Sequence, residues 1–329
     1  MPFAPDDPHP FVTVFIPTWN GGELFEEVLT ELKAQETSWP YEIFAIDSGS
    51  KDGTIERLKR HGIRVTSIDN SEFDHGLTRN RAVHEARGEI VALTVQDATP
   101  ESRDWLHRLV SNFEDQEVAG AYCNQIPRPN CSPFLKWRLQ TWVRGGGEPE
   151  VRQVSSQEAF WNDLDHVERW RTIAFDNVAS AVRRRVALEY PFPRRRFGED
   201  VTWAKGAILA GYKIVMEPRV AVIHSHDNSI WYEFRRAYLD HQNVNNLVGL
   251  RLAPRLRNVF EYAAGQSRHL AKAVWADRDL SIPEKIWWTL KIPLFTFTQN
   301  LAQFLGPLSN QQGRRGLWKI WDKIAGHHV

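Results

Sequence analysis

The chain has 329 residues, enough for one large domain or for one domain plus an appendage, and its 42% hydrophobic and 25% charged residues are ordinary for a globular protein. Lys plus Arg and Asp plus Glu both number 41, so the net charge is zero, which excludes a global polyanion-binding surface and predicts no nucleic-acid partner. The two cysteines, Cys123 and Cys131, are too few for a disulfide framework and favour a reducing, cytoplasmic setting.

The N-terminal residues show no basic segment followed by an apolar run, and no long uninterrupted apolar stretch occurs elsewhere. We therefore expect neither a signal peptide nor a membrane-spanning helix.

Short apolar segments alternate with helical patterns through the first third of the chain. The predicted strands are residues 12–16, 41–46, 63–68, 89–95 and 118–123, and the predicted helices begin near residues 24, 54, 73 and 103. This β-α alternation predicts an α/β fold with a mostly parallel, doubly wound sheet.

The pattern changes after residue 124. Residues 125–156 hold four prolines and Gly145–Gly147, which predicts a loop-rich insertion over the sheet edge. Residues 175–190 return to the fold, 199–210 predict a helix ended by Gly211, and 213–216 and 219–224 predict two short strands. From residue 229 the pattern is helical, with expected helices at 230–248, 256–274, 283–304 and 314–324.

Polar residues gather where the predicted strands end. They are Thr18 and Asn20 after the first strand, which ends at Pro17, Asp47 and Ser48 after the second, and Asp97 after the fourth. Ligands of doubly wound sheets bind beyond these carboxyl ends, where a carboxylate can hold a ribose hydroxyl or a base N–H. Each residue is also a common turn former or helix cap, but three strand ends together favour a nucleotide pocket.

Residues 73–80 form a glycine turn that leads into a helix. Arg79 lies near the start of that helix, where a guanidinium beside the positive end of the dipole suits a phosphate. The alternative is a surface arginine on an amphipathic helix.

The strings Pro17-Thr18-Trp19-Asn20 and Asp47-Ser48-Gly49-Ser50-Lys51-Asp52-Gly53-Thr54 resemble family 2 glycosyltransferases of the GT-A fold, over roughly residues 11–226. The resemblance implies a Rossmann-like catalytic domain at 1–228, with a donor half at about 11–124 and an acceptor half at about 125–228, followed by a helical region at 229–329. It implies that Thr18, Asn20 and Asp47 hold the nucleotide.

The string His75-Gly76-Leu77-Thr78-Arg79-Asn80, with Gln96–Pro100 downstream, looks like the rhamnosyltransferase branch of that family. The resemblance implies dTDP-L-rhamnose as the donor and adds His75, Gly76, Arg79 and Gln96 to the donor-binding residues. The nearest variant is the same fold with a UDP-hexose donor.

A metal site is the next implication. The family usually binds Mg²⁺ or Mn²⁺ through an Asp-x-Asp motif, but here the stretch reads Val95-Gln96-Asp97, so one acid remains. Asp97, diphosphate oxygens and a distant ligand could suffice for a hard cation. His224 is the candidate for that ligand, with His226 beside it, because similar enzymes have a C-terminal histidine that reaches the metal. The alternative is a structural histidine at a strand end.

An inverting transfer needs a general base for the acceptor hydroxyl. Glu199 and Asp200 stand together at a predicted helix start, and they resemble the Glu-Asp motif of the family, whose Asp is the base. We assign that role to Asp200 and a supporting one to Glu199. The alternative is that both acids merely stabilise the helix N-terminus. Arg183–Arg185 and Arg194–Arg196 flank the motif and could pair with phosphates or be solvated.

Aromatic and basic residues interleave at helical spacing over residues 285–305 and 314–324. This pattern suits a helix at a membrane interface, and equally a helical subdomain packed on the core or on another subunit. By analogy with similar enzymes, the acceptor is a cell-surface glycan or its polyprenyl-diphosphate-linked precursor, and the enzyme is cytoplasmic, peripheral on the inner face of the membrane.

Two further readings compete with this one. The missing first acid of the metal motif allows a catalytically silent donor-binding subunit. A nucleotidyltransferase is weaker, because Gly21-Gly22 is too little for its phosphate loop.

Overall fold

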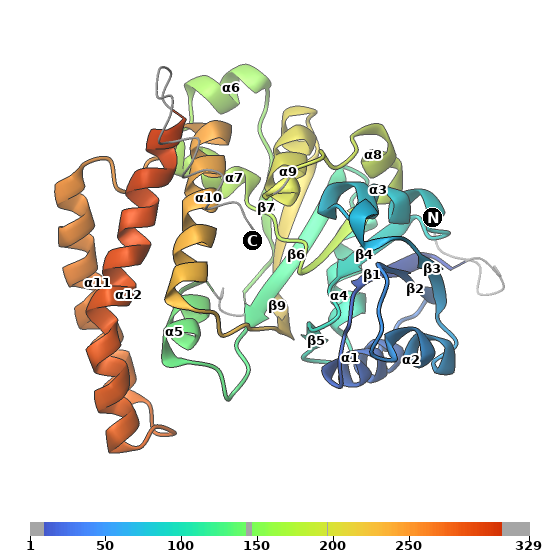
Figure 1. Ribbon diagram of the computed structural model, residues 1–329. Helices are drawn as coiled ribbons and strands as arrows, with labels where there is room; N and C mark the ends of the chain where they lie inside the picture. The colour runs from blue at the N-terminus through green and yellow to red at the C-terminus, as the bar shows by residue number, and fades with distance from the viewer. Residues whose placement is uncertain (1–9, 143–146, 196, 311–329) are drawn as a thin grey trace. The chain divides into compact units, whose positions relative to one another are not determined.

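The computed structural model describes residues 10–142, 147–195 and 197–310 (Figure 1). The chain divides into two compact units. The first comprises Met1–Arg128, Trp142–Asp165 and Arg171–His224, and the second comprises Pro129–Thr141, His166–Trp170 and Ser225–Val329. The division at residue 228 stays a prediction, as do the two halves of the catalytic domain.

The first unit is built on one mixed sheet with the strand order β3-β2-β1-β4-β8-β6-β9-β5, and β7 pairs with β9. The strands are β1 (Val12–Thr18), β2 (Tyr41–Asp47), β3 (Arg64–Ser67), β4 (Ile90–Thr94), β5 (Thr99–Pro100), β6 (Val118–Ile126), β7 (Glu150–Arg152), β8 (Ala179–Arg183) and β9 (Lys213–Ile223). β3, β2, β1 and β4 run parallel, as does the β6–β9 pair, which confirms the predicted α/β class.

Helices connect these strands. They are α1 (Leu24–Lys33), α2 (Thr54–Arg60), α3 (His75–Glu85), α4 (Trp105–Ser111), α5 (Pro133–Trp142), α6 (Gln157–Asn162), α7 (His166–Ile173), α8 (Arg184–Glu189) and α9 (Glu199–Leu209), with single turns η1 (Asn70–Glu72) and η2 (Asn112–Glu114). Val12, Val14 and Ile16 of β1 are fully buried in one cluster with Phe25 of α1 and Trp105 of α4. Each such side chain contributes about 1.5–3 kcal/mol on burial, so this cluster fixes the strand ends that carry the site.

Two parts of the sheet differ from the prediction. β8 is antiparallel to both of its neighbours, β4 and β6. β9 is one strand rather than two, because the register with β6 shifts between Cys123 and Asn124 and the resulting irregularity accommodates Pro218.

The prediction of a loop-rich insertion over residues 125–156 was wrong. α5 and β7 lie in this stretch, and α5 begins at Pro133. Proline suits the first position of a helix, because its missing N–H would have no partner there and its φ is already helical. Of the Gly145–Gly147 run, only Gly147 lies in the described part of the chain.

The second unit contains three long helices, α10 (Ile230–Val248), α11 (Leu256–Ala276) and α12 (Ile282–Ser309), close to the predicted ranges. α12 packs against both α10 and α11. Phe134 of α5 joins their core, stacked on Phe295 with 4.5 Å between ring centroids. The expected helix at 314–324 lies outside the described residues.

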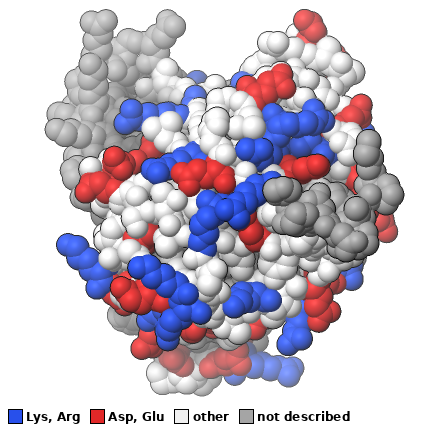
Figure 2. Space-filling model, turned by 90° about the vertical axis from the view of Figure 1, so that its right-hand side faces the viewer, with Lys and Arg blue, Asp and Glu red and all other residues white. Residues whose placement is uncertain are grey.

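None of the helices in the described part of the chain is sufficiently long and apolar to cross a membrane. On the face of the molecule drawn in Figure 2, basic and acidic side chains are interspersed. Ion pairs among the described residues of the first unit include those of Arg64 with Glu42 and Glu85, at 3.4 and 3.8 Å.

Candidate functional site

The first group of predicted site residues forms the turns after β1 and β2. Thr18 donates its hydroxyl to Asp47 Oδ2 at 2.9 Å, and the Ser48 N–H donates to the Thr18 carbonyl at 2.9 Å. Asp47 is fully buried and also accepts the N–H groups of Gly49 and Ser50 and the Ser50 hydroxyl. The hydrogen bonds of Asp47 therefore hold the turn after β2 in place. The exposed atoms at this end of β1 and β2 belong to neighbouring residues.

Asn20 holds the two turns together. It has a φ of 48°, the one left-handed non-glycine residue in the described ranges. Its N–H donates to Ser50 Oγ and its Oδ1 accepts the Lys51 N–H, both at 2.8 Å. Asparagine tolerates this conformation better than most residues, and backbone strain of this kind gathers at functional sites.

Gln96 holds the segment next to Asn20. Its side-chain amide accepts the Trp19 N–H at 2.8 Å and donates to the Trp19 carbonyl at 3.0 Å. The Trp19 indole is 54% exposed, and Pro17 stands in register with Ile46 of β2. An exposed, clamped indole at the end of β1 offers a flat apolar surface, which sequence reasoning did not single out.

The His75–Asn80 string forms the first turns of α3. Asp74 caps this helix by accepting the N–H groups of Gly76 and Leu77, both at 3.0 Å. A Cβ on Gly76 would lie 2.3 Å from the Pro193 carbonyl oxygen, so this position requires glycine. Burial, with Arg79 adjacent, lowers the pKa of His75 and keeps its ring neutral.

Arg79 was predicted to meet a phosphate, and that role stays a prediction. In the structure its guanidinium is buried and donates to Glu199 Oε1 at 2.6 Å. Asn80, one residue on, accepts the Phe192 N–H and donates to the Phe192 carbonyl, both at 2.8 Å. Arg79 and Asn80 therefore hold the segment that leads into Glu199 and Asp200.

Glu199 and Asp200 occupy the first turn of α9, after Gly198 with a φ of 72°. Burial, followed by the negative charges of Glu199 and Asp176, raises the pKa of Asp200 to about 8, against weaker opposing contributions from the Val201 N–H and Arg79. A carboxyl group with this pKa can take up a proton near neutral pH, which is the property of a general base.

Asp97 and His224 lie far apart in the sequence of the first unit. β5 pairs with the end of β9, with Thr99 opposite Ile223, and this pairing brings the two residues together. Arg128 adds a second link, because its guanidinium donates to the carbonyl oxygens of Asp97 and Ile223 at 3.0 and 3.4 Å. The His224 Nε2 lies 3.6 Å from Asp97 Oδ1.

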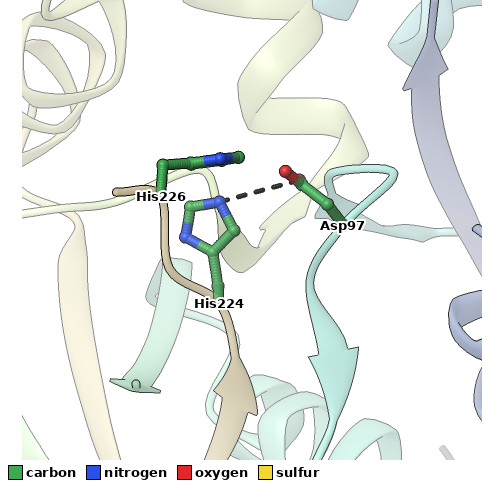
Figure 3. Close-up of side chains that lie close together, drawn as sticks. All are labelled: Asp97, His224 and His226. Carbon is green, nitrogen blue, oxygen red and sulfur yellow. Dashed lines mark ion pairs between the residues drawn. The ribbon is translucent and has the colours of Figure 1, made fainter. Parts of the chain in front are cut away.

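His226 follows two residues after His224. One ligand atom from each of Asp97, His224 and His226 lies within 4.8 Å of the others, and Figure 3 shows the two side chains of the Asp97–His224 pair directed toward each other. A carboxylate oxygen with imidazole nitrogens suits a divalent cation of the Mn²⁺ type. Val95, at the position of the absent acid, packs against the apolar core.

His224 is also held from its other side. Its Nδ1 lies 2.9 Å from Gln125 Oε1, and Gln125 Nε2 donates to Asp176 Oδ2. Sequence reasoning missed Gln125 and Arg128, because the predicted strand stopped at Cys123 and the following residues were assigned to a loop. Asp176 lies in the stretch 175–190 that was assigned to the fold, but no motif singled it out.

The arginine runs have different surroundings. Arg183, Arg184 and Arg185 donate to backbone carbonyl oxygens, including those of Val118, Val83 and Gln116, so they support packing. In the second run, Arg194 is largely exposed, with Nε 3.9 Å from Asp74. Arg196 lies outside the described residues.

A mixed sheet with linked turns at its strand ends, a paired Asp and His and a partly buried carboxyl group of raised pKa is the arrangement of a GT-A glycosyltransferase. The sequence model of glycosyl transferase family 2 matches residues 13–190, more than half of the chain, and the chain belongs to that family.

Named relatives agree with this assignment. The chain is 29% identical to the O-antigen chain rhamnosyltransferase RfbN of Salmonella typhimurium, over 90% of this chain and 89% of that protein. It is 28% identical to the O-antigen chain rhamnosyltransferase WbaN of Salmonella anatum, with the same coverage of 90% and 89%. Among solved structures, a mannosyltransferase of Pyrobaculum calidifontis in complex with GDP-Man and Mn²⁺ is similar in fold, with a TM-score of 0.58, 21% identity and coverage of 94% and 89%.

Proposed function

We propose that this glycosyltransferase transfers L-rhamnose from dTDP-L-rhamnose to a hydroxyl of a bacterial cell-surface glycan or its lipid-linked precursor, with inversion at the anomeric carbon. The observation that carries the proposal is the raised pKa of Asp200, about 8, on the unit that also holds the turns of Thr18 and Asp47 and the Asp97–His224 pair. The two O-antigen relatives support the donor and the type of acceptor.

The nucleotide half of the site is assigned to the β1 and β2 turns. Thr18, Asp47 and Ser48 fix the turn from within, so the contacts to the base and ribose come from the turn's exposed backbone, from Asn20 and from Trp19. Stacking of a base on an exposed aromatic ring contributes about 1–3 kcal/mol.

A divalent metal, Mn²⁺ or Mg²⁺, would be held by Asp97 and His224, with His226 next to them. Such an ion supplies positive charge to the leaving diphosphate. The mixed oxygen and nitrogen ligand set favours Mn²⁺. The pairing of β5 with β9 and the contacts of Arg128 support the assignment of Asp97 and His224 to one metal site.

In the transfer, the acceptor oxygen attacks the anomeric carbon of the sugar. Its proton passes to the Asp200 carboxylate, and the bond between that carbon and the diphosphate oxygen breaks, releasing the nucleoside diphosphate. Glu199 is held by Arg79 beside Asp200 and keeps the proton affinity of that carboxylate high. General-base catalysis of this kind contributes about 10²–10⁴-fold in rate.

The test measures release of nucleoside diphosphate from dTDP-L-rhamnose and from UDP-hexoses. We expect turnover of dTDP-L-rhamnose; turnover of a UDP-hexose alone would refute the donor assignment. Asp200→Asn should lower the rate by about a hundredfold or more while donor binding by calorimetry is unchanged. An active Asp200→Asn variant would refute the base, and a wild-type chain that binds donor without turnover would favour the silent donor-binding subunit.

We further propose that α12 contacts an anionic membrane surface. Its exposed apolar residues fall at intervals of four and lie on one face: Ile282, Ile286, Leu290 and Leu294, exposed by 59%, 49%, 72% and 57%. Trp287 is 57% exposed, and Lys291 Nζ lies 4.2 Å from the centre of its ring. Apolar and aromatic residues flanked by lysine are typical of interfacial helices.

Sedimentation with vesicles tests this contact. We expect binding to vesicles containing phosphatidylglycerol, and Leu290→Glu should weaken it. Equal binding by wild type and Leu290→Glu would refute the contact, and concentration-dependent dimerisation without vesicle binding would assign the stripe to a second copy of the chain.

A further inference from the structure

The far side of the His224 ring is part of a three-residue hydrogen-bond chain. Gln125 lies on β6 and His224 directly follows β9, and these two strands pair with Gln125 opposite Val222 and Ile126 opposite Ile223. Asp176 lies just before β8, and its Oδ1 accepts the Val178 N–H at 2.9 Å while Oδ2 faces Gln125. This hydrogen-bond relay runs from Asp176 through Gln125 to His224, and its three residues all belong to the first unit.

The direction of every hydrogen bond in this chain follows from its first member. An ionised carboxylate only accepts, so the Gln125 amide must direct its NH₂ toward Asp176. Its carbonyl oxygen Oε1 then faces His224 Nδ1 at 2.9 Å and also only accepts, so Nδ1 carries the imidazole proton. In the neutral ring the lone pair is therefore on Nε2, the atom that lies 3.6 Å from Asp97 Oδ1.

We propose that Gln125 and Asp176 are positioning residues that fix the tautomer and the ring orientation of His224, so that Nε2 and the Asp97 carboxylate face a divalent cation together. This inference rests on the metal part of the proposed function and names the residues that prepare that site. A lone pair and a carboxylate directed at one another require positive charge between them, which a cation supplies.

The relay also explains why an amide side chain, that of Gln125, is suited to the position between Asp176 and His224. A carboxylate in direct contact with the imidazole would increase its basicity, whereas the neutral amide keeps the negative charge one residue away. That charge is then close enough to contribute to the raised pKa of Asp200. One acid thus orients the proposed metal ligand and acts on the proposed base.

The first experiment measures Mn²⁺ affinity by electron paramagnetic resonance in the presence of dTDP, at about pH 8, where an ordinary imidazole is neutral. Gln125→Ala should weaken Mn²⁺ binding by about 10–100-fold, the usual effect of losing a partner of a ligating histidine. The double variant Gln125→Glu/Asp176→Asn should retain affinity within about threefold, because Glu still accepts the Nδ1 proton and the Asn amide can donate to the other Glu oxygen. Asp176→Asn alone should weaken binding, though less than Gln125→Ala, because an Asn amide can present either its oxygen or its NH₂ and no longer fixes the direction of the Gln125 amide.

Gln153→Ala is the matched control, because Gln153 donates to the Gly211 carbonyl at 2.8 Å, away from the relay, and its loss should leave Mn²⁺ affinity unchanged. Wild-type affinity in Gln125→Ala, with a weakened His224→Ala, would overturn the relay alone. Wild-type affinity in His224→Ala would overturn the metal site itself, and the relay with it.

The second experiment needs no metal. Nitrogen-15 NMR distinguishes protonated from unprotonated ring nitrogens, and comparison with His224→Gln identifies the His224 signals. We expect protonated Nδ1 and unprotonated Nε2 in wild type and in the Gln125→Glu/Asp176→Asn double variant, and a mixture of tautomers in Gln125→Ala. Protonated Nε2 in the wild-type protein would overturn the proposal.

Discussion

The raised pKa of Asp200 leads to a quantitative expectation for the pH dependence of the transfer. The carboxyl group must be ionised to accept the proton of the acceptor hydroxyl, so kcat/KM should rise with pH until the group is fully ionised. With a pKa of about 8, roughly 1% of the free enzyme is ionised at pH 6, and kcat/KM there should be about a hundredfold below its plateau. An ordinary aspartate would give a flat profile over this range.

Glu199→Gln perturbs this pKa through its electrostatic causes. The change removes the negative charge that raises the pKa of Asp200 most. It also frees Arg79, whose positive charge lowers that pKa. The rising limb of the pH profile should therefore move down by about one to two pH units. It should not return to the range of an ordinary aspartate, because burial is the largest cause and remains.

The assay follows nucleoside diphosphate release at limiting donor and acceptor from about pH 5 to pH 9, and it compares the position of the limb rather than the height of the plateau. Glu56→Gln is the matched control, because Glu56 is exposed on α2. A limb at the same pH in wild type and Glu199→Gln would show that Asp200 is not the titrating group, and highest activity near pH 5 would refute the base role.

Three further outcomes are expected from the same region. Gly76→Ala should lower the free energy of unfolding by about 1–3 kcal/mol in urea titrations, because its Cβ would meet a backbone carbonyl at 2.3 Å, whereas Gly206→Ala, with open space at Cβ, should not destabilise. Arg79→Ala should cost about 3–5 kcal/mol in the same titrations, since it leaves Glu199 buried without its partner, and a loss below about 1 kcal/mol would contradict a buried ion pair. Between its ordinary pKa of 3.8 and about 8, Asp200 binds a proton in the native state that the unfolded state has lost, so wild-type stability should fall as pH rises; Asp200→Asn should therefore have the higher melting temperature above pH 8, an advantage that disappears toward pH 4.

The sequence predicted the elements that depend on local pattern. The buried runs of β1 and β4 and the helices α10 to α12 follow hydrophobic periodicity, and the structure confirms them. The antiparallel direction of β8 could not be predicted, because Ala179–Arg183 is buried throughout and a fully buried strand has the same pattern in either direction. α5 was missed because a proline that starts a helix was taken for one that breaks it.

Long-range pairing limited the prediction of the site. Asp97 and His224 were both singled out, but only the β5–β9 pairing shows how they come together. Arg79 was singled out for a phosphate, a role that stays a prediction, while its partner Glu199, 120 residues away, could not be found from spacing. Gln125 and Asp176 are ordinary polar residues in sequence, and their significance depends on the order of donors and acceptors in space.

The joining of Asp97 to the end of β9 has a consequence for the order in which the protein acquires its parts. The turns of Thr18 and Asp47 involve only the first strands, which a ribosome completes early. Asp97 must wait for more than a hundred further residues before β9 and His224 emerge. If the proposed metal site is correct, a nascent chain can form the turns of Thr18 and Asp47 well before that site is complete, and Mn²⁺ affinity would report whether the last strand has entered the sheet.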